Sequence, residues 1–225
     1  MTTTLNHRYA TLLQELQQLA PQNPPQLIAV SKTVTAAKIH ELYQLGQRLF
    51  GENRYPDLLS KQQQLASTCP DIEWHYIGRV QTRQVKEFIN QIAYLHSLDR
   101  LELAKEIQKR ATQPVSCFLQ VNISGESTKA GFEPDELLTV LEQLAHYDKI
   151  KVVGLMTMAP FDARDAEIHY FFQQLKALQE AVQALNLPHA PCTLTSMGMS
   201  QDYPIATKLG ASYIRVGSLL FDETE

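Results

Sequence analysis

The sequence lacks the features that mark secreted and membrane-bound chains. Only three of its 225 residues are cysteines, and Cys69, Cys117 and Cys192 fit neither a disulfide framework nor a C-x-x-C motif. The N-terminus has no charged segment followed by an apolar stretch, as a signal peptide would have. No apolar run approaches the ~20 residues that a membrane-spanning helix needs. These absences predict a cytoplasmic protein with no membrane partner.

Blocks of like charge and histidine-based metal motifs are also absent. The chain has 24 acidic and 20 basic residues, a net charge of −4, and no run of five or six like charges. An electrostatic surface for nucleic acid is therefore not expected. The seven histidines never form H-x-H or H-E-x-x-H, so no metal site is expected.

Short apolar stretches alternate with helical patterns along the chain. Leucines at helical spacing predict a first helix over 4–20, closed by Pro21. Strands are predicted at 27–33, 48–53, 73–78, 94–98, 115–123, 152–156, 192–195 and 213–216. The helices predicted after them lie at 35–45, 57–66, 83–92, 101–111, 134–147, 168–185 and 203–209.

Eight alternating strands and helices predict a parallel sheet, because parallel neighbours need a long return connection. In a chain of this length they favour a closed (β/α)8 TIM-type barrel. An open Rossmann-like sheet is the alternative, but no predicted strand is followed by G-x-G-x-x-G. We expect one domain over 1–225, with a helix and linker at about 1–26 and the barrel at 27–221.

Lys32 ends the apolar stretch LIAVSKT, which spans 27–33. An ammonium group at the end of a buried strand must find an anion, reach water or lose its proton, and losing the proton makes it a nucleophile. The barrel would place Lys32 at the carboxyl ends of the strands, where barrels carry function. The alternatives are a lysine that reaches solvent and one that pairs with Glu52.

Polar residues end several of the other predicted strands. These residues are Asn53, His75, Asn122 and Arg215. For Arg215 the alternative role is that of an ion-pair partner at the barrel rim. The segment 196–200 and the pair Gly217-Ser218 follow the last two strands. Their small residues suit a phosphate, with a helix start near Gln201 adding its positive end, although an ordinary glycine turn is the alternative.

Seven segments, in order, carry a resemblance to a known family: AVSKT, FGEN, WHYIG, VNISGE, GLMTMAP, SMGMS and IRVGSLLF. Together they resemble the YggS/PROSC family of pyridoxal-phosphate-binding proteins from about Leu27 to Phe221. That family is similar to the barrel domain of alanine racemase, a fold-type III barrel. It is implicated in vitamin B6 balance, without established catalysis. The segments 79–83 and 54–57 depart from the usual family wording, which affects loop contacts and not the lysine.

The resemblance implies a set of cofactor-binding residues. Lys32 would hold pyridoxal 5'-phosphate as a Schiff base, the internal aldimine. Ser200, Gly217 and Ser218 would hold the phosphate, Arg215 would face the pyridine nitrogen, and Asn53 would lie beside the ring. An arginine stays protonated and cannot give its proton to the ring, so it weakens the electron sink and argues against a transaminase.

The resemblance also frames what the protein does with the cofactor. Alanine racemase adds a second domain and a tyrosine from the partner subunit, for which a chain ending at Glu225 leaves no room. Tyr55, Tyr76 and His75 are stand-ins for that acid, and nothing selects among them. We therefore expect a monomeric carrier that passes the cofactor to apo-enzymes, with a racemase-like enzyme as the alternative. Lys129 is either a solvated charge or a contact for an incoming phosphate.

Overall fold

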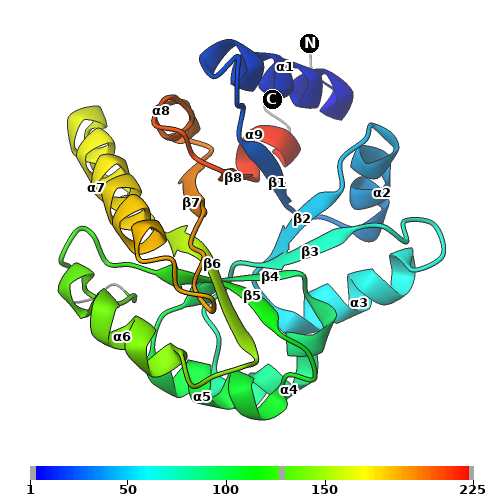
Figure 1. Ribbon diagram of the computed structural model, residues 1–225. Helices are drawn as coiled ribbons and strands as arrows, with labels where there is room; N and C mark the ends of the chain where they lie inside the picture. Colours follow the sequence, from blue (N-terminus) through cyan, green and yellow to red (C-terminus); the bar gives the residue numbers. More distant parts are fainter. Residues whose placement is uncertain (1–3, 127–129, 223–225) are drawn as a thin grey trace.

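Eight parallel strands pair in sequence order into a closed barrel (Figure 1). The computed structural model describes residues 4–126 and 130–222. The barrel closes where β1 pairs with β8, from Gln26 opposite Tyr213 to Ala29 opposite Val216. The predicted (β/α)8 barrel is thus confirmed. Its strands are β1 (Gln26–Val30), β2 (Leu49–Glu52), β3 (Glu73–Tyr76), β4 (Tyr94–Leu98), β5 (Val115–Gln120), β6 (Ile150–Met156), β7 (Leu194–Met199) and β8 (Tyr213–Val216).

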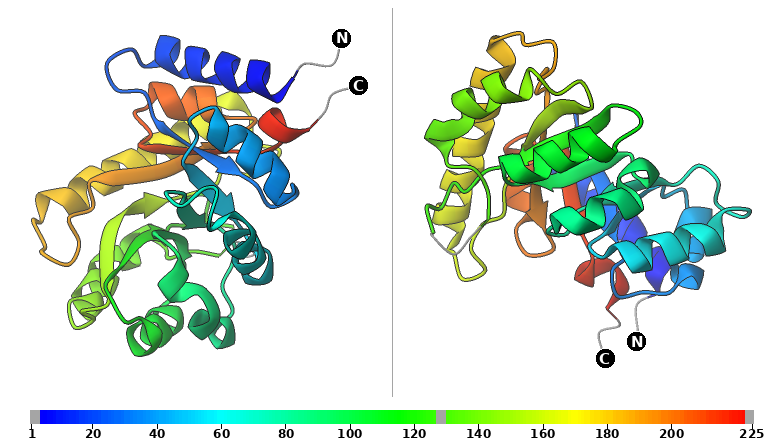
Figure 2. Two further views of the ribbon diagram at one scale, coloured as in Figure 1. Left: turned by 90° about the vertical axis from the view of Figure 1, so that its right-hand side faces the viewer. Right: turned by 90° about the horizontal axis from the view of Figure 1, so that it is seen from below.

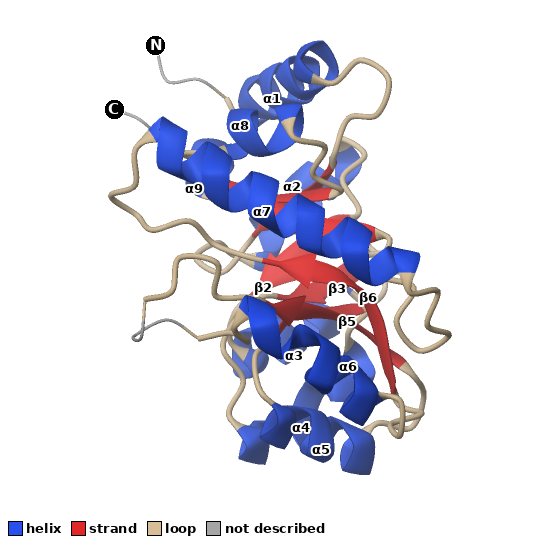
Figure 3. Cartoon of the chain, turned by 60° about the vertical axis from the view of Figure 1, so that its left-hand side comes forward, coloured by secondary structure: helices blue, strands red, loops and turns tan. Residues whose placement is uncertain are grey.

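Helices surround the strands, as Figure 3 shows with helices in blue and strands in red. They are α1 (Leu5–Leu19), α2 (Ala36–Gln44), α3 (Tyr55–Leu65), η1 (Thr82–Gln84), α4 (Val85–Phe88), η2 (Ile89–Gln91), α5 (Leu101–Arg110), η3 (Pro134–Glu136), α6 (Leu137–Leu144), α7 (Asp165–Ala184), α8 (Tyr203–Lys208) and α9 (Ser218–Phe221). None of the helices in the described part of the chain combines the length and apolar character needed to cross a bilayer.

The helix α1 packs against the C-terminal helices α8 and α9, so the two ends of the chain lie on the same side of the molecule (Figure 2). Thr4 caps α1 by accepting a hydrogen bond from the His7 amide at 3.3 Å. The Arg8 guanidinium donates from Nε to the Leu220 carbonyl of α9 at 2.7 Å. The extra N-terminal helix therefore covers the last segment of the barrel.

Several element boundaries differ from the sequence prediction for identifiable reasons. The strand β1 ends at Val30, and Lys32 lies in the turn after it. The strand β5 ends at Gln120 because the chain then bridges to its own loop, with Val121 paired to Phe132. The strand β7 begins at Leu194 because Cys192 has a φ of 44°, which no strand residue adopts.

Two of the predicted helices also change. The single helix predicted over 83–92 is broken into η1, α4 and η2, and the helix predicted over 134–147 starts as η3 and ends at Leu144. The helix α9 was not predicted, because four residues are too few to show helical periodicity.

The inside of the barrel holds aromatic, aliphatic and polar side chains together. Phe118 of β5 and Tyr213 of β8 meet edge to face with ring centroids 5.8 Å apart, although their strands are not neighbours. Only side chains that point inward can meet across a closed barrel. Ile28, Val153 and Met156 complete this inner apolar cluster. The carboxyl end of the barrel above it carries the polar residues described next.

Candidate functional site at the carboxyl end of the barrel

Lys32 lies at the carboxyl end of β1 with an exposed side chain. The amide of Val34 donates to the Ser31 carbonyl at 3.1 Å and closes a turn with Lys32 at its second position. Ser31 itself is fully buried, and its amide donates to the Gly51 carbonyl at 3.0 Å, which extends the pairing of β1 with β2. The Lys32 side chain therefore extends into solvent from a hydrogen-bonded turn. It is not sheltered at the end of a strand, as the predicted strand 27–33 implied.

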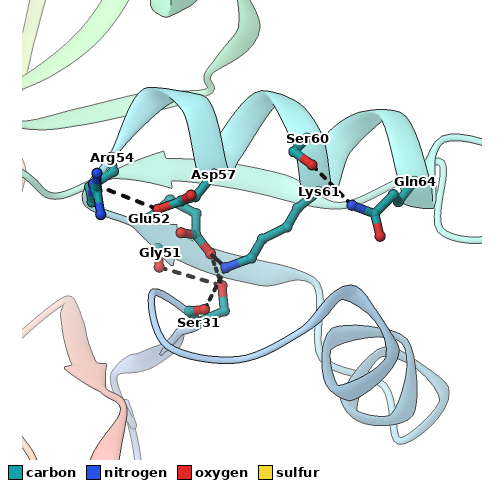
Figure 4. Close-up of polar contacts among 8 residues, drawn as sticks. All are labelled: Ser31, Gly51, Glu52, Arg54, Asp57, Ser60, Lys61 and Gln64. Atoms are coloured by element: carbon teal, nitrogen blue, oxygen red, sulfur yellow. Dashed lines mark hydrogen bonds and ion pairs between the residues drawn. The ribbon is translucent and has the colours of Figure 1, made fainter.

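Glu52, the alternative partner of Lys32, is occupied by another lysine. Its Oε1 accepts from Lys61 Nζ at 2.8 Å and from Ser31 Oγ at 2.6 Å (Figure 4). The pairing of Lys32 with Glu52 considered from the sequence is therefore wrong. Among residues 4–126 and 130–222, no carboxylate forms an ion pair with the Lys32 ammonium.

The loops after β7 and β8 meet at the other side of the mouth. The Leu219 amide in the first turn of α9 donates to Ser200 Oγ at 3.5 Å, a long contact that brings the two loops together. Gly217 and Ser218 precede and begin α9, so the helix end beside them is that of α9. The first N–H groups of a helix have no partner within it and favour an anion.

The helix start expected near Gln201 is found at Tyr203 and has a different neighbour. The buried Asp202 stands directly before α8, and its carboxylate accepts a hydrogen bond from the Met199 amide. Burial raises the pKa of Asp202, an effect opposed by that hydrogen bond and by Arg215. The positive end of α8 thus already has a carboxylate next to it, which leaves α9 as the helix end near Ser200.

Arg215 is buried at the carboxyl end of β8, with 5% of its surface exposed. Its Nη1 donates to Ser196 Oγ at 2.6 Å and its Nη2 to the Thr157 carbonyl at 3.2 Å. Burial lowers its pKa to about 10, with Asp202 opposing the shift, so the guanidinium is charged at neutral pH. Because its described hydrogen bonds go to neutral oxygens, the rim ion pair considered from the sequence is not what holds it.

A chain of hydrogen bonds runs from Arg215 through the barrel interior. Ser196 Oγ lies 2.8 Å from His96 Nδ1, and His96 Nε2 lies 2.9 Å from His75 Nδ1. His75 Nε2 then lies 3.0 Å from the Glu73 carboxylate at the start of β3. His75, one of the three stand-ins for an acid, is thus a hydrogen-bonded residue of the barrel interior. Arg215, Ser196, His96, His75 and Glu73 are called the barrel chain below.

Charge and burial set the direction of this chain. Burial lowers the pKa of His75, and it lowers the pKa of His96 further, together with the charges on His75 and Arg215. Both rings are therefore neutral at pH 7, with one N–H each. Since Glu73 accepts only, His75 carries its proton on Nε2, His96 donates from Nε2, and Ser196 donates to His96 Nδ1. This tautomer assignment follows from the hydrogen bonds and makes Arg215 the first donor.

Asn53 follows β2 directly and has a half-buried side chain. Its carbonyl accepts from the Tyr76 hydroxyl at 3.2 Å, and Gly78 packs so closely that an added Cβ would lie 2.1 Å from the same oxygen. Burial raises the pKa of Tyr76 to about 12, so this hydroxyl is a donor at neutral pH. The backbone of Asn53 is thus fixed at the mouth beside β1.

A cavity of about 320 Å³ opens on the remaining part of the mouth, over β3, β5, β6 and β7. Arg79, Asn122, Met158, Phe161 and Met199 are among the residues that line it, and Lys32 is not. The cavity adjoins the predicted cofactor residues only at the end of β7, where Met199 precedes Ser200, and the other predicted residues follow β1 and β2 or lie in and after β8. The predicted residues and the cavity therefore divide the mouth between them.

Some residues of this end of the barrel were outside the reach of the sequence. Lys61 and His96 had no assigned role, because each stands alone in an ordinary helix or strand pattern. Ser196 was expected in the phosphate segment 196–200 after the strand, but it lies within β7 and its Oγ is hydrogen-bonded to His96 and Arg215. Lys129, considered as a phosphate contact, lies outside the described residues. Within the described residues, no group of three histidine, cysteine, aspartate or glutamate side chains could hold a metal ion.

Comparison with known proteins finds a matching family model and relatives that are similar over most of their length. The family model of the alanine racemase N-terminal domain matches residues 7–224. The pyridoxal phosphate homeostasis protein of Aquifex aeolicus is 39% identical over 208 residues, which cover 90% of this chain and 88% of that protein.

Solved structures agree with these relatives. PipY of Synechococcus elongatus, solved with pyridoxal phosphate bound, superposes with a TM-score of 0.83 at 34% identity and covers 97% of this chain and 100% of PipY. The alanine racemase of Corynebacterium glutamicum has a TM-score of 0.74 at 16% identity, where 98% of this chain covers 61% of the racemase. The racemase comparison shows a shared fold and no more.

Proposed function

Because the chain belongs to the alanine racemase N-terminal domain family and, within it, to the pyridoxal phosphate homeostasis proteins, we propose that it binds pyridoxal 5'-phosphate and keeps its supply balanced. One observation supports this most directly. An exposed primary amine, Lys32, stands without a carboxylate partner among the described residues, at the same mouth as the buried guanidinium of Arg215.

The residues of the mouth fit this cofactor by the chemistry of their groups. When bound, the cofactor supplies an aldehyde whose carbon forms a C=N bond to a primary amine as one water leaves. Lys32 would supply that amine from the turn after β1. Ser200, Gly217 and Ser218 offer a hydroxyl pair and the start of α9 to the phosphate. Asn53, which directly follows β2, would lie beside the ring.

Arg215 sets the electronic character of the proposed site. The guanidinium stays charged and would donate a hydrogen bond to the pyridine nitrogen without transferring a proton. This weakens the electron sink, so Arg215 argues against a transaminase and suits either a protein that holds the cofactor or a racemase that avoids a long-lived carbanion. Of these two we propose the holder, which passes the cofactor to apo-enzymes. We propose a monomer, because all the proposed contacts come from one chain. We place this role in the cytosol, because Cys69, Cys117 and Cys192 are free thiols, as is usual in a reducing compartment.

Covalent trapping tests the proposed site. Protein incubated with pyridoxal phosphate should turn yellow, and borohydride should fix the cofactor on Lys32, located by peptide mass. Lys32→Ala should lose the covalent label and keep its unfolding midpoint, because the side chain is exposed. Lys38→Ala, which removes an exposed lysine of α2, is the matched control and should label like the wild type. No uptake by the wild type, or a label elsewhere, would rule the site out.

Cofactor transfer tests the carrier role separately. Loaded protein mixed with an apo-enzyme should restore enzyme activity faster than the same amount of cofactor released by dilution alone. Exchange of the α-hydrogen of amino acids for solvent deuterium at a turnover rate would instead favour the racemase-like alternative. Activation that merely follows spontaneous release would contradict directed transfer.

A further inference from the structure

A buried ion pair lies directly beneath the turn that carries Lys32. Lys61 of α3 and Glu52 of β2 have side chains that are 10% and 0% exposed, with Nζ and Oε1 2.8 Å apart. Figure 4 shows the Lys61 side chain reaching from α3 to Glu52 and Ser31. Replacing such a pair by apolar residues of equal volume is often neutral or stabilising, so stability alone does not explain its presence.

The contacts of the pair show what it holds. Lys61 Nζ donates to the Ser31 carbonyl at 2.7 Å, and this is the same oxygen that accepts from Val34 to close the Lys32 turn. Lys61 thus fixes the peptide that joins Ser31 to Lys32. A backbone oxygen that accepts from two donors has both lone pairs occupied. Rotating this peptide would therefore break at least one of the two hydrogen bonds.

Glu52 connects the same peptide to the neighbouring strand. Its Oε1 accepts from Ser31 Oγ at 2.6 Å, while its Oε2 is buried with no partner among the described residues. Ser31 and Glu52 directly precede Lys32 and Asn53, two residues of the proposed site. The pair therefore couples the ends of β1 and β2 at the point where both site residues leave their strands.

We propose that Lys61 and Glu52 are positioning residues that hold the Ser31–Lys32 peptide so that the Lys32 amine meets the cofactor in a fixed orientation. This inference rests on the proposed function for the identity of the cofactor. A small misplacement of a reacting group is enough to slow a reaction by about 100-fold, so an anchored peptide matters for the rate of bond formation.

Three variants separate positioning from stability. Lys61→Met alone leaves the Glu52 carboxylate buried and unpaired, which threatens folding. The main variant is therefore Glu52→Gln combined with Lys61→Met, which removes both charges and keeps an acceptor for Ser31 Oγ. The matched control is Lys38→Met, which breaks the exposed Lys38–Glu41 pair in α2 without touching the turn. Urea unfolding confirms that each variant is folded.

The first measurement uses cofactor-free protein. Hydrogen exchange of the Val34 amide, which closes the turn, should become at least about 10-fold faster in the double variant, because the Ser31 carbonyl has lost its second donor. Lys38→Met should leave this exchange rate unchanged. An unchanged rate in the double variant would overturn the proposal, whatever ligand the protein binds.

The second measurement is the rate of covalent labelling of Lys32 by pyridoxal phosphate, quenched with borohydride. It should fall about 10- to 100-fold in the double variant and stay at the wild-type value in Lys38→Met. Faster amide exchange with an unchanged labelling rate would show a loosened turn that does not position Lys32, and would overturn the proposal. A wild type that is never labelled would refute the proposed function, while the amide exchange still tests the anchored turn.

Discussion

Arg215 shows how one buried side chain orders the interior of the barrel. Arg215 can only donate hydrogen bonds, and its described acceptors are neutral. Along the barrel chain each hydrogen bond is donated in the same direction, away from Arg215 and toward Glu73, whose side chain is 40% exposed. A cation and a carboxylate thus stand at the two ends of a chain of neutral groups. Each group accepts on one side and donates on the other, so Arg215 has a single favoured orientation at the mouth.

The barrel chain makes stability depend on pH. The folded state lowers the pKa of His75 and His96, whereas unfolded histidines titrate near 6.5. Below about pH 6.5 the unfolded chain binds more protons than the folded one, so the free energy of unfolding falls as the pH falls and is fully retained above that value. Each histidine contributes a slope of up to about 1.4 kcal/mol per pH unit.

Urea unfolding between pH 5 and pH 8 measures this slope. His96→Gln removes one titrating ring and keeps an amide donor for His75, so its slope below pH 6.5 should be shallower than that of the wild type. His169→Gln, which changes an exposed histidine of α7, should keep the wild-type slope. Equal slopes for His96→Gln and the wild type would show that the buried ring does not control the acid response.

At the scale of elements, the strand β7 and the helix α8 set the position of the Ser200 loop. Gly198 has a φ of 92°, and a Cβ there would lie 2.6 Å from the Ala206 Cβ of α8. The close approach lets α8 pack on β7 while the chain turns toward Ser200. Gly46 has a φ of 104° after α2, but a Cβ there meets nothing within 4 Å.

These two glycines separate backbone strain from packing. Gly46→Ala should lower the free energy of unfolding by about 1 to 2 kcal/mol, the cost of a left-handed alanine. Gly198→Ala should lower the free energy of unfolding by a further ~1 to 3 kcal/mol, because α8 must move as well. Urea denaturation of both variants measures the difference. An equal loss of unfolding free energy at the two positions would mean that α8 moves aside at no cost in stability.

At the scale of the whole molecule, the first and last strands complete the barrel, and α1 packs over α8 and α9. The β1–β8 pairing and the bond from Arg8 to Leu220 join segments about as far apart in the chain as the described residues allow. The main hydrophobic core likewise contains residues from Leu5 to Leu220. The barrel therefore closes only when its first and last strands pair.

This closure predicts one cooperative unfolding transition. Trp74, the only tryptophan of the sequence, lies in β3 and reports on that side of the barrel by fluorescence. Circular dichroism reports on all helices, and the two urea curves should coincide. For a monomer, the midpoint should also be independent of protein concentration over a tenfold range. Separate transitions would contradict a single domain, and a concentration-dependent midpoint would contradict a monomer.

The sequence by itself determined the order of the elements and the family. Apolar periodicity within short windows was enough to predict eight strands, because the same local spacing that makes a strand or a helix also makes it amphipathic. It also singled out Lys32, since a lysine that follows an apolar stretch is unusual wherever the strand ends. What the local pattern missed was the exact strand end at Val30 and the four-residue helix α9.

Only the tertiary structure decided which side chains meet. Glu52 pairs with Lys61 and not with Lys32, because α3 folds back over β2 and brings Lys61 to the end of β1. His96 and Ser196 are 100 residues apart in the chain and meet only because β4 and β7 face each other across a closed barrel. Such contacts depend on barrel closure and strand register, which no short window of sequence contains.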